Sequence, residues 1–427
     1  MKKLVTLGLL FVICLSLNAQ YIKLDASFYS EALDEMKNVD IYLPSDYYNY
    51  DTVFFPVIYY LHGGGGDQNS GNQFASHYYY THAENPLADS APAAIFVCAD
   101  GSYDPYYGGY WVNSELFGNH EDYVINDLIS FIESEFRARS DRNFRFITGY
   151  SMGGFGSTYL ALSHPDIFRA CSPMSSAYLT FADTVISSLE ESLLEENGDY
   201  HFSLSAGRAS KFFLTLSGAI SPNMEIEPYP MELLWDTNGN WVDTVWVKWQ
   251  DFDCSAKIKN LTSENKLDFF LSCGTEDDII CYPPYLQFED TLTKYNIDFV
   301  SIYNEYIHGE IDIIANALMW NWMDSLAYIS LQHVGVNESH LDSWEKISLF
   351  PNPITTTAKL RVPNASAGTR NIWIYTMTGI CLKSWEFANS KSGQQEFTLN
   401  LNDLPAGVYF LKLNIDKEVL TKKFIKY

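Results

Sequence analysis

Short apolar runs alternate with helix-like segments over much of the chain. Five runs are typical of buried strands, and they lie at residues 54–61, 94–98, 144–148, 267–273 and 297–303. Between the second and third runs, apolar side chains recur at three- and four-residue steps, as in an amphipathic helix, at Val124, Ile125, Leu128, Ile129 and Ile132. Strands separated by helices predict a mostly parallel sheet with helices on both faces. We therefore expect an α/β fold over residues 20–332.

Two segments depart from this alternation. Residues 175–265 contain an acidic helical stretch at 187–197 and a turn-rich piece at 236–240. They predict either an insertion or lid over the edge of the sheet or simply more of the same fold. After Met323 the helical pattern fades, and residues 333–345 are typical of a linker.

Residues 346–427 follow a different pattern. Turn signals separate six strand candidates, at residues 358–362, 372–377, 379–387, 395–401, 408–415 and 419–425. This density of short strands predicts a small β-sandwich. The charge also changes sign, because this segment holds 11 Lys+Arg and 5 Asp+Glu, whereas the rest of the chain holds 16 and 48. The contrast indicates two units with different roles.

Composition excludes some classes of protein. The 427 residues carry 27 Lys+Arg and 53 Asp+Glu, a net charge of −26, which disfavours nucleic acid and anionic membrane surfaces as main partners. Because 47% of the residues are hydrophobic and 19% are charged, the chain can bury a large core and is not disordered throughout.

The N-terminus resembles an export signal. Lys2 and Lys3 precede an apolar stretch at residues 4–17, and we predict a signal peptide over residues 1–19, with cleavage after Ala19. The stretch is too short to span a bilayer, and no other segment is suitable, so no stable membrane span is expected. Six cysteines remain after cleavage; their spacing fixes no disulfide pairing and matches no zinc-ligand pattern.

The sharpest motif is Gly-Tyr-Ser-Met-Gly at residues 149–153, which matches G-x-S-x-G. It follows a strand candidate and opens a helix-like stretch. A serine at such a tight turn projects its hydroxyl above the sheet, and the crowded backbone tolerates little but glycine at the flanking positions. We therefore predict that Ser151 is a nucleophile and that the Met152 N–H is one donor to an oxyanion.

A serine hydroxyl needs a base, and the base needs an orienting acid. In this fold the chain order is Ser, then Asp or Glu, then His. His308 follows the last strand candidate, and the turn after the preceding strand contains Glu276, Asp277 and Asp278. We predict His308 as the base and Asp277 as the acid, with Asp278 and Glu276 as alternatives for the acid.

The second oxyanion donor is expected in the glycine loop at residues 63–66, which follows the first strand candidate. Its glycines let the backbone approach a substrate closely. We predict Gly64 as the donor, with Gly65 as the alternative. A phosphate-binding loop is excluded because no Lys-Ser/Thr pair follows the glycines.

These motifs resemble those of the esterase D family of α/β-hydrolases, which includes feruloyl and acetylxylan esterases, S-formylglutathione hydrolases and antigen 85 acyltransferases. The resemblance covers about residues 20–325 and includes YYLHGGGGD, CADGSY, FITGYSMGGFGS, LSCGTEDD and IHGE. It implies an α/β-hydrolase fold and a triad of Ser151, Asp277 and His308, without a cofactor or metal. One departure is Ile307, which stands where the family often has glycine.

Members that cut plant-wall esters often carry aromatic residues after the Asp-Gly turn, and this chain has several there. The resemblance implies substrate contacts at Tyr107 and Trp111, and we add Tyr150 beside the nucleophile.

Residues 346–427 include SLFPNP, IYTMTG and LPAGVYFLKL, and they resemble a type A C-terminal sorting domain of the type IX secretion system. This resemblance implies export through the periplasm, a secreted or cell-surface location, and the secretion machinery as a partner. A binding module or a plain sandwich is the alternative for this segment.

Together these features predict an exported serine esterase that removes feruloyl or acetyl groups from plant cell-wall polysaccharides. An acyltransferase or a peptidase on the same scaffold is an alternative. A catalytically inactive, carbohydrate-binding surface protein is another.

Overall fold

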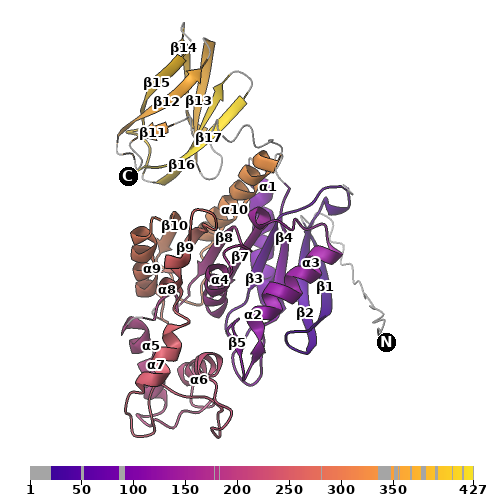
Figure 1. Cartoon of the computed structure of the whole chain (residues 1–427), viewed down its shortest axis with the longest axis vertical. Helices are drawn as coiled ribbons and strands as arrows, with labels where there is room; N and C mark the ends of the chain where they lie inside the picture. Colours follow the sequence, from indigo (N-terminus) through magenta and orange to yellow (C-terminus); the bar gives the residue numbers. More distant parts are fainter. Residues whose placement is uncertain are drawn as a thin grey trace. The chain divides into compact units, whose positions relative to one another are not determined.

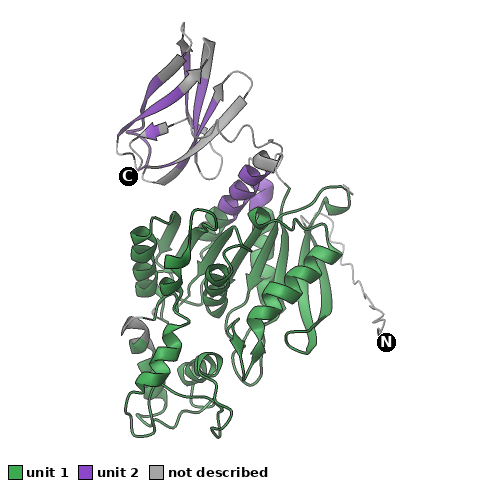
Figure 2. Ribbon diagram, in the orientation of Figure 1, with its two compact units in different colours: residues 1–80, 92–319 green, residues 81–91, 320–427 purple. Residues whose placement is uncertain are grey.

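The computed structural model (Figure 1) describes residues 21–49, 52–85, 92–176, 178–181, 183–279, 281–334, 348–350, 354, 356–365, 368–376, 381–389, 393–405, 407–415 and 418–426. The predicted signal peptide at residues 1–19 lies outside the described residues. Two compact units can be distinguished (Figure 2): residues 1–80 with 92–319, and residues 81–91 with 320–427.

The first unit is built on an eight-stranded sheet of order β1-β2-β4-β3-β7-β8-β9-β10 (Figure 1). The strands are β1 (Tyr21–Ser30), β2 (Glu35–Pro44), β3 (Val57–Leu61), β4 (Ile95–Ala99), β7 (Arg145–Tyr150), β8 (Ala170–Met174), β9 (Asp268–Gly274) and β10 (Phe299–Asn304). Neighbouring strands from β4 to β10 are parallel, whereas β1 and β2 form an antiparallel edge. The predicted mostly parallel sheet is confirmed, and the five predicted strands correspond to β3, β4, β7, β9 and β10.

Helices cover both faces of this sheet. They are α1 (Asn72–Glu84), α2 (His120–Asp122), a π-helical turn (Tyr123–Leu128), α3 (Ile129–Glu135), α4 (Met152–Ser163) and α9 (Tyr282–Lys294). Helix α10 (Ile313–Val334) begins in this unit and continues into the second. On one face, Tyr59 of β3 shares an apolar core with Phe155 of α4. On the opposite face, the next residue of β3, Tyr60, stacks on Phe74 of α1 with ring centroids 4.8 Å apart. This alternation explains why the central strands are apolar throughout.

The sequence analysis did not predict strands β1, β2 and β8, and it placed the end of helix α10 too early. Strands β1 and β2 pair along their whole length but carry polar residues at many positions, so their pattern is weak. Strand β8 contains Pro173, which normally disfavours a central strand. Helix α10 continues to Val334, beyond the predicted loss of helical pattern and into the predicted linker, and residues 335–347 lie outside the described part.

The chain between β8 and β9 forms a group of helices that lie together in Figure 1: α5 (Asp183–Glu195), α6 (Arg208–Ile220), α7 (Asp243–Gln250) and α8 (Cys254–Lys257). Phe213 of α6 and Trp249 of α7 are fully buried, with ring centroids 6.4 Å apart. The carboxylate of Glu195 accepts hydrogen bonds from the N–H groups of Ala209 and Ser210 and so ties the end of α5 to the start of α6. The segment is therefore packed and folded. A short hairpin, β5 (Asn113–Ser114) and β6 (Gly118–Asn119), completes this unit.

The C-terminal strands form two antiparallel sheets. One contains β11 (Ser348–Phe350), β12 (Thr357–Ala365) and β15 (Gly393–Asn400); the other contains β13 (Gly368–Thr376), β14 (Cys381–Asn389), β16 (Gly407–Ile415) and β17 (Glu418–Lys426). Leu360 and Leu399 of the first sheet share one buried core with Ile374 and Leu411 of the second. This arrangement fits the predicted small β-sandwich. The six predicted strands correspond to β12 through β17, and β11 was not predicted.

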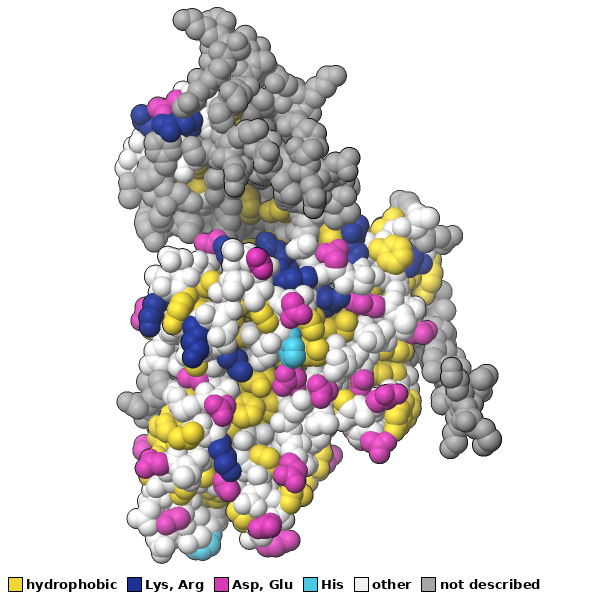
Figure 3. Space-filling model, viewed as in Figure 1, with side chains coloured by type: hydrophobic (Ala, Val, Ile, Leu, Met, Phe, Trp, Pro, Cys, Tyr) yellow, Lys and Arg dark blue, Asp and Glu magenta, His cyan; other side chains and the backbone are white. Residues whose placement is uncertain are grey.

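Acidic side chains are scattered over the face of the first unit that Figure 3 shows, between apolar and neutral ones. This distribution agrees with the strongly negative charge of residues 1–345. In the parts of the chain that the structure describes, no helix combines the length and apolarity that crossing a membrane requires.

Candidate active site

Ser151 occupies the sharp turn between β7 and α4. Its backbone has φ 55° and ψ −115°, a conformation that a non-glycine residue rarely adopts, and its N–H donates to the Met174 carbonyl at 2.9 Å. A Cβ atom on Gly149 would overlap the backbone of Gly153, and one on Gly153 would overlap the Leu61 carbonyl. These close approaches explain the flanking glycines of the motif and aim the serine side chain away from the sheet.

Ser151, His308 and Asp277 form a continuous chain of hydrogen bonds. His308 Nε2 lies 2.9 Å from Ser151 Oγ, and His308 Nδ1 lies 2.9 Å from Asp277 Oδ2. Asp277 and His308 are both 8% exposed. Because a carboxylate only accepts hydrogen bonds, Nδ1 carries a proton and Nε2 is free to accept the serine hydroxyl proton. The structure thus brings the three predicted residues together from the ends of β7, β9 and β10.

The neighbouring acids occupy different places. Asp278 Oδ1 accepts the backbone N–H of His308 at 3.1 Å, so Asp278 holds the backbone of the histidine rather than its ring. Burial acts to raise the pKa of Asp278, but the His308 N–H and the charge of Arg208 outweigh it, and the pKa lies below its ordinary value. Glu276 is exposed. Of the three acids, Asp277 alone is hydrogen-bonded to the imidazole among the described contacts.

The two predicted oxyanion donors are the N–H of Met152, directly after the serine, and the N–H of Gly64 in the glycine loop, which comes close to Ser151 at Gly63. Met152 is the first residue of α4, where the N–H groups have no partner within the helix. In the glycine loop, Gly66 N–H donates to Gly63 O at 3.1 Å, and Gly65 N–H donates to Tyr107 O at 2.8 Å. Because Gly65 N–H is already used, and Gly64 N–H has no acceptor among the described residues, the geometry favours Gly64 over its alternative.

His62 holds this loop in place, and the sequence reasoning missed it. The buried ring donates from Nδ1 to Gly63 O at 2.8 Å and accepts the Gly101 N–H at Nε2 at 2.9 Å. Burial lowers the pKa of His62, so the ring stays neutral, as this pair of bonds requires. The only signal in the sequence was a histidine directly before the glycine run, between a buried strand and a flexible loop.

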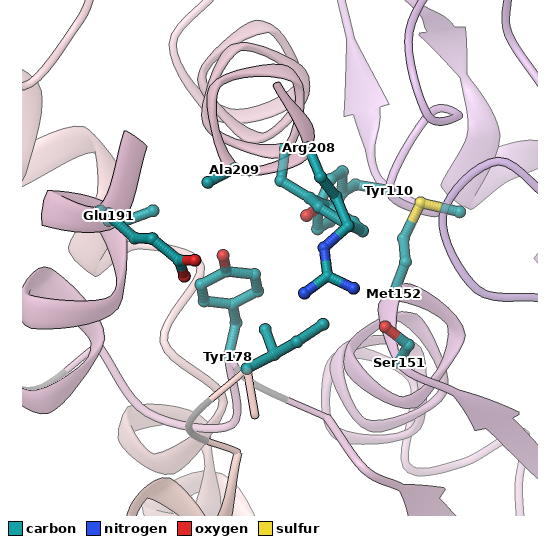
Figure 4. Close-up of a pocket in the computed structure, with 10 residues that line it drawn as sticks. Tyr110, Ser151, Met152, Tyr178, Glu191, Arg208 and Ala209 are labelled. Carbon is teal, nitrogen blue, oxygen red and sulfur yellow. The ribbon is translucent and has the colours of Figure 1, made fainter. Parts of the chain in front are cut away.

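A pocket opens beside the serine. It is lined by Tyr110, Ser151, Met152, Tyr178, Leu189, Glu191, Arg208, Ala209, Phe212 and Ile279. Figure 4 shows that the Arg208 guanidinium and the Tyr178 hydroxyl extend toward its centre. Helices α5 and α6 therefore contribute a wall of the pocket.

The three aromatic residues predicted to contact substrate differ in position. Trp111 is fully buried and packs where a Cβ on Gly101 or Gly156 would strike its ring, so it has no open face, and its predicted substrate contact is wrong. Tyr150 lies with its ring centroid 5.2 Å from that of His308. Tyr107 packs on Phe212, a pocket residue, at 4.5 Å between ring centroids. The ring N–H of Trp111 instead donates to the His62 carbonyl at 3.4 Å.

One group of side chains near the serine has the chemistry to hold a metal ion. Ligand atoms of Asp277, Cys281 and His308 all lie within 4.8 Å of one another. Cys281 is fully buried, and this burial raises the pKa of its thiol well above the ordinary value. The described cysteines Cys98, Cys171, Cys254, Cys273 and Cys281 form no disulfide with one another.

The chain matches the family described as "Putative esterase" over residues 30–284, which is more than half of its length, and it belongs to that family. Together with the sheet order and the helices on both faces, this establishes an α/β-hydrolase fold. Residues 348–427 match the "Secretion system C-terminal sorting domain", as the sequence predicted. A domain of this kind points to secretion or to the cell surface.

Similar proteins are esterases too. Two curated relatives from Mycobacterium tuberculosis, Esterase MT1326 and Esterase Rv1288, are each 29% identical over 150 residues, or 35% of this chain. The chain matches only 31% of the length of these relatives. The solved structure of a ferulic acid esterase superposes with a TM-score of 0.51 at 15% identity, over 73% of this chain and 99% of that one. At that identity the likeness concerns the fold alone.

Proposed function

We propose that this protein is a secreted serine esterase that hydrolyses feruloyl or acetyl esters on plant cell-wall polysaccharides through an acyl-enzyme. The observation that carries the proposal is the hydrogen-bonded chain from Ser151 through His308 to Asp277, which opens onto a pocket in a chain of the esterase family. The sorting domain supports the extracellular setting. The choice of plant polysaccharide as the substrate rests on the resemblance of the sequence motifs to those of the esterase D family.

In the first half of the reaction, His308 Nε2 takes the hydroxyl proton of Ser151 while Oγ attacks the ester carbonyl carbon. The Asp277 carboxylate fixes the ring orientation and stabilises the imidazolium that forms. The carbonyl oxygen becomes an oxyanion, and in this proposal the N–H groups of Met152 and Gly64 stabilise it by donating hydrogen bonds to it. The imidazolium then gives its proton to the leaving alcohol, and the acyl group stays on Oγ.

In the second half, a water molecule takes the place of the alcohol. His308 removes one of its protons, and the resulting nucleophile attacks the acyl carbon. The tetrahedral intermediate uses the same two N–H donors and collapses with release of the carboxylic acid, and Ser151 recovers its proton. The cycle needs no cofactor, because each proton is transferred through the one imidazole ring.

The pocket supports a bulky acyl group over a small one. Phe212, Tyr178 and Ile279 provide aromatic and apolar surface in the pocket that Ser151 also lines. An acetyl group would leave most of this surface without contact, whereas a hydroxycinnamoyl group would bury its ring against it. Feruloyl esters are therefore the favoured substrates within the proposal.

The purified chain and its Ser151→Ala variant test the proposal on methyl ferulate, acetylated xylan and p-nitrophenyl acetate. We expect turnover by the native chain, a preference for methyl ferulate, and a loss of at least about 10⁴-fold in the variant. A fluorophosphonate probe should label the native chain at Ser151 only. If the native chain shows no turnover and is not labelled, the result would instead support an inactive carbohydrate-binding protein.

A further inference from the structure

A buried thiol lies against the imidazole on the side away from Ser151. Cys281 Sγ is 3.6 Å from His308 Nδ1, and it also lies 3.3 Å from the Ser175 carbonyl oxygen, its hydrogen-bond acceptor. The Asp277 carboxylate completes the group, with all three ligand atoms within 4.8 Å of one another. The hydrolytic cycle described above uses Asp277 and His308 but has no role for Cys281.

We propose that Cys281, His308 and Asp277 form an inhibitory site for a thiophilic divalent cation of the Zn²⁺ type. The inference rests on the proposed function, because His308 must be the catalytic base for the cation to act as an inhibitor. Thiolate, imidazole and carboxylate are the ligands that zinc binds in proteins. In the described part of the chain, no other trio of His, Cys, Asp or Glu side chains has this arrangement.

The distances suit a tetrahedral ion. With Zn–S near 2.3 Å and Zn–N near 2.0–2.1 Å, tetrahedral angles separate the sulfur and nitrogen by about 3.5 Å. The separation of Cys281 Sγ and His308 Nδ1 is 3.6 Å. The Nδ1 to Asp277 distance of 2.9 Å is that of a hydrogen bond, so the carboxylate has to move back by roughly half an ångström.

The charges suit a buried site as well. A divalent cation, one thiolate and one carboxylate sum to zero, and a neutral imidazole adds no charge. Cys281 is fully buried and Asp277 is nearly so. A neutral cluster avoids the large cost of an unpaired charge in an apolar environment. Because the ligands are buried, the cation reaches them slowly, and inhibition should develop with time.

Binding at Nδ1 would stop the reaction through the position of one proton. In the free protein, Nδ1 carries the ring proton and donates it to Asp277, while Nε2 keeps a lone pair for the Ser151 hydroxyl. The cation forms a bond to the Nδ1 lone pair, the ring proton moves to Nε2, and the thiol proton leaves to solvent. Nε2 then has no lone pair, so it cannot accept a proton from Ser151.

Binding is tested first without any catalytic readout. The full chain with Ser151→Ala is titrated with Cd²⁺, and the ultraviolet thiolate-to-metal charge-transfer band is recorded. We expect a band that saturates near one Cd²⁺ per chain, and no such band in Ser151→Ala/Cys281→Ala. A band that persists without Cys281, or no band in the parent, would overturn the inference whether or not the protein is an esterase.

Inhibition is tested next. The full chain is preincubated with Zn²⁺, and its residual ester hydrolysis is compared with its own metal-free rate. We expect time-dependent inhibition that EDTA reverses, and a half-inhibiting Zn²⁺ concentration that rises at least about tenfold in Cys281→Ala. Cys171→Ala, another buried cysteine, serves as the control and should keep the native sensitivity. Cys281→Ser preserves the side-chain volume if the alanine variant folds poorly. Equal sensitivity in the native chain and both Cys281 variants would contradict the site.

Discussion

His308 Nε2 lies 2.9 Å from Ser151 Oγ, although 157 residues separate the two in sequence. The distance is that of a hydrogen bond, and it forms because the two residues follow different parallel strands whose carboxyl ends meet at one edge of the sheet. The strands β8 and β9 lie between the two elements in the sheet, so the contact is made by the loops above it. The proposed catalytic step depends on this relationship.

Two adjacent acids are expected to behave very differently. Asp277→Asn keeps the size of the side chain but no longer stabilises the imidazolium or fixes its tautomer, so kcat should fall by about 10⁴-fold. Asp278→Asn is the matched control, because the Asp278 carboxylate contacts the backbone N–H of His308 and the exposed guanidinium of Arg208 but not the imidazole ring. Its kcat should fall less than about tenfold. Steady-state kinetics on methyl ferulate checks both. Similar losses in the two variants would mean that Asp277 does not orient the base.

The glycine loop should be sensitive to a single methyl group. A Cβ on Gly64 would lie 2.7 Å from Cε1 of Phe212, so Gly64→Ala has to displace the ring or the backbone donor. If the donor moves, kcat should fall by about 10² to 10³, as when one oxyanion donor is removed.

A second substitution, Phe212→Ala, tests whether the contact with the Phe212 ring causes the loss of activity. In the Phe212→Ala background the added methyl group has room, and we expect Gly64→Ala to lose much less activity there. Gly309→Ala is the control, since a Cβ on Gly309 meets no atom within 4 Å. A Gly64→Ala variant with native kcat would remove the support for this residue as a donor.

Stability should depend on pH through a buried histidine. Burial, and after it the charge of Lys37, lowers the pKa of His120 from 6.5 to about 3 in the folded chain. The unfolded chain therefore takes up a proton as the pH falls below 6.5, whereas the folded chain does not until about pH 3. The contribution of His120 to the unfolding free energy is therefore fully present above pH 6.5, and it falls by about 3 kcal/mol when the pH is lowered to 4.

Urea unfolding between pH 4 and pH 7 measures this dependence, and His120→Gln isolates the share of one residue. The variant can be less stable overall, because His120 is tightly packed against Gly109. The slope of its unfolding free energy against pH should nevertheless be shallower. An unchanged slope would show that another group dominates the acid sensitivity.

Export should depend on the C-terminal unit. In a bacterium with a type IX secretion system, the full chain should reach the medium or the cell surface, whereas a chain without residues 348–427 should stay in the periplasm. Immunoblots of the periplasmic and external fractions, with a periplasmic marker as a control for lysis, give the answer. Unchanged export of the shortened chain would favour a binding module.

Much of this fold could be predicted from sequence because its signals are local. The strands β3, β4 and β7 are buried on both faces, so their apolar residues form continuous runs. The tight turn at Ser151 can be identified because close backbone contacts require glycine at positions 149 and 153. By contrast, β8 carries a proline and β1 a mixed pattern, and they are strands because of their neighbours in the sheet.

The features of the candidate site also fall into those that local sequence predicts and those that only the tertiary structure decides. The sequence by itself predicted the proposed nucleophile, the order of the proposed acid and base along the chain, and the glycine loop, because each depends on residue type within a short motif. Tertiary structure alone decided between Asp277 and Asp278, buried Trp111 away from the pocket, and placed Cys281 against the imidazole. These outcomes depend on the direction of side chains from distant loops, and that direction is set by packing rather than by the identity of a residue or its neighbours in sequence.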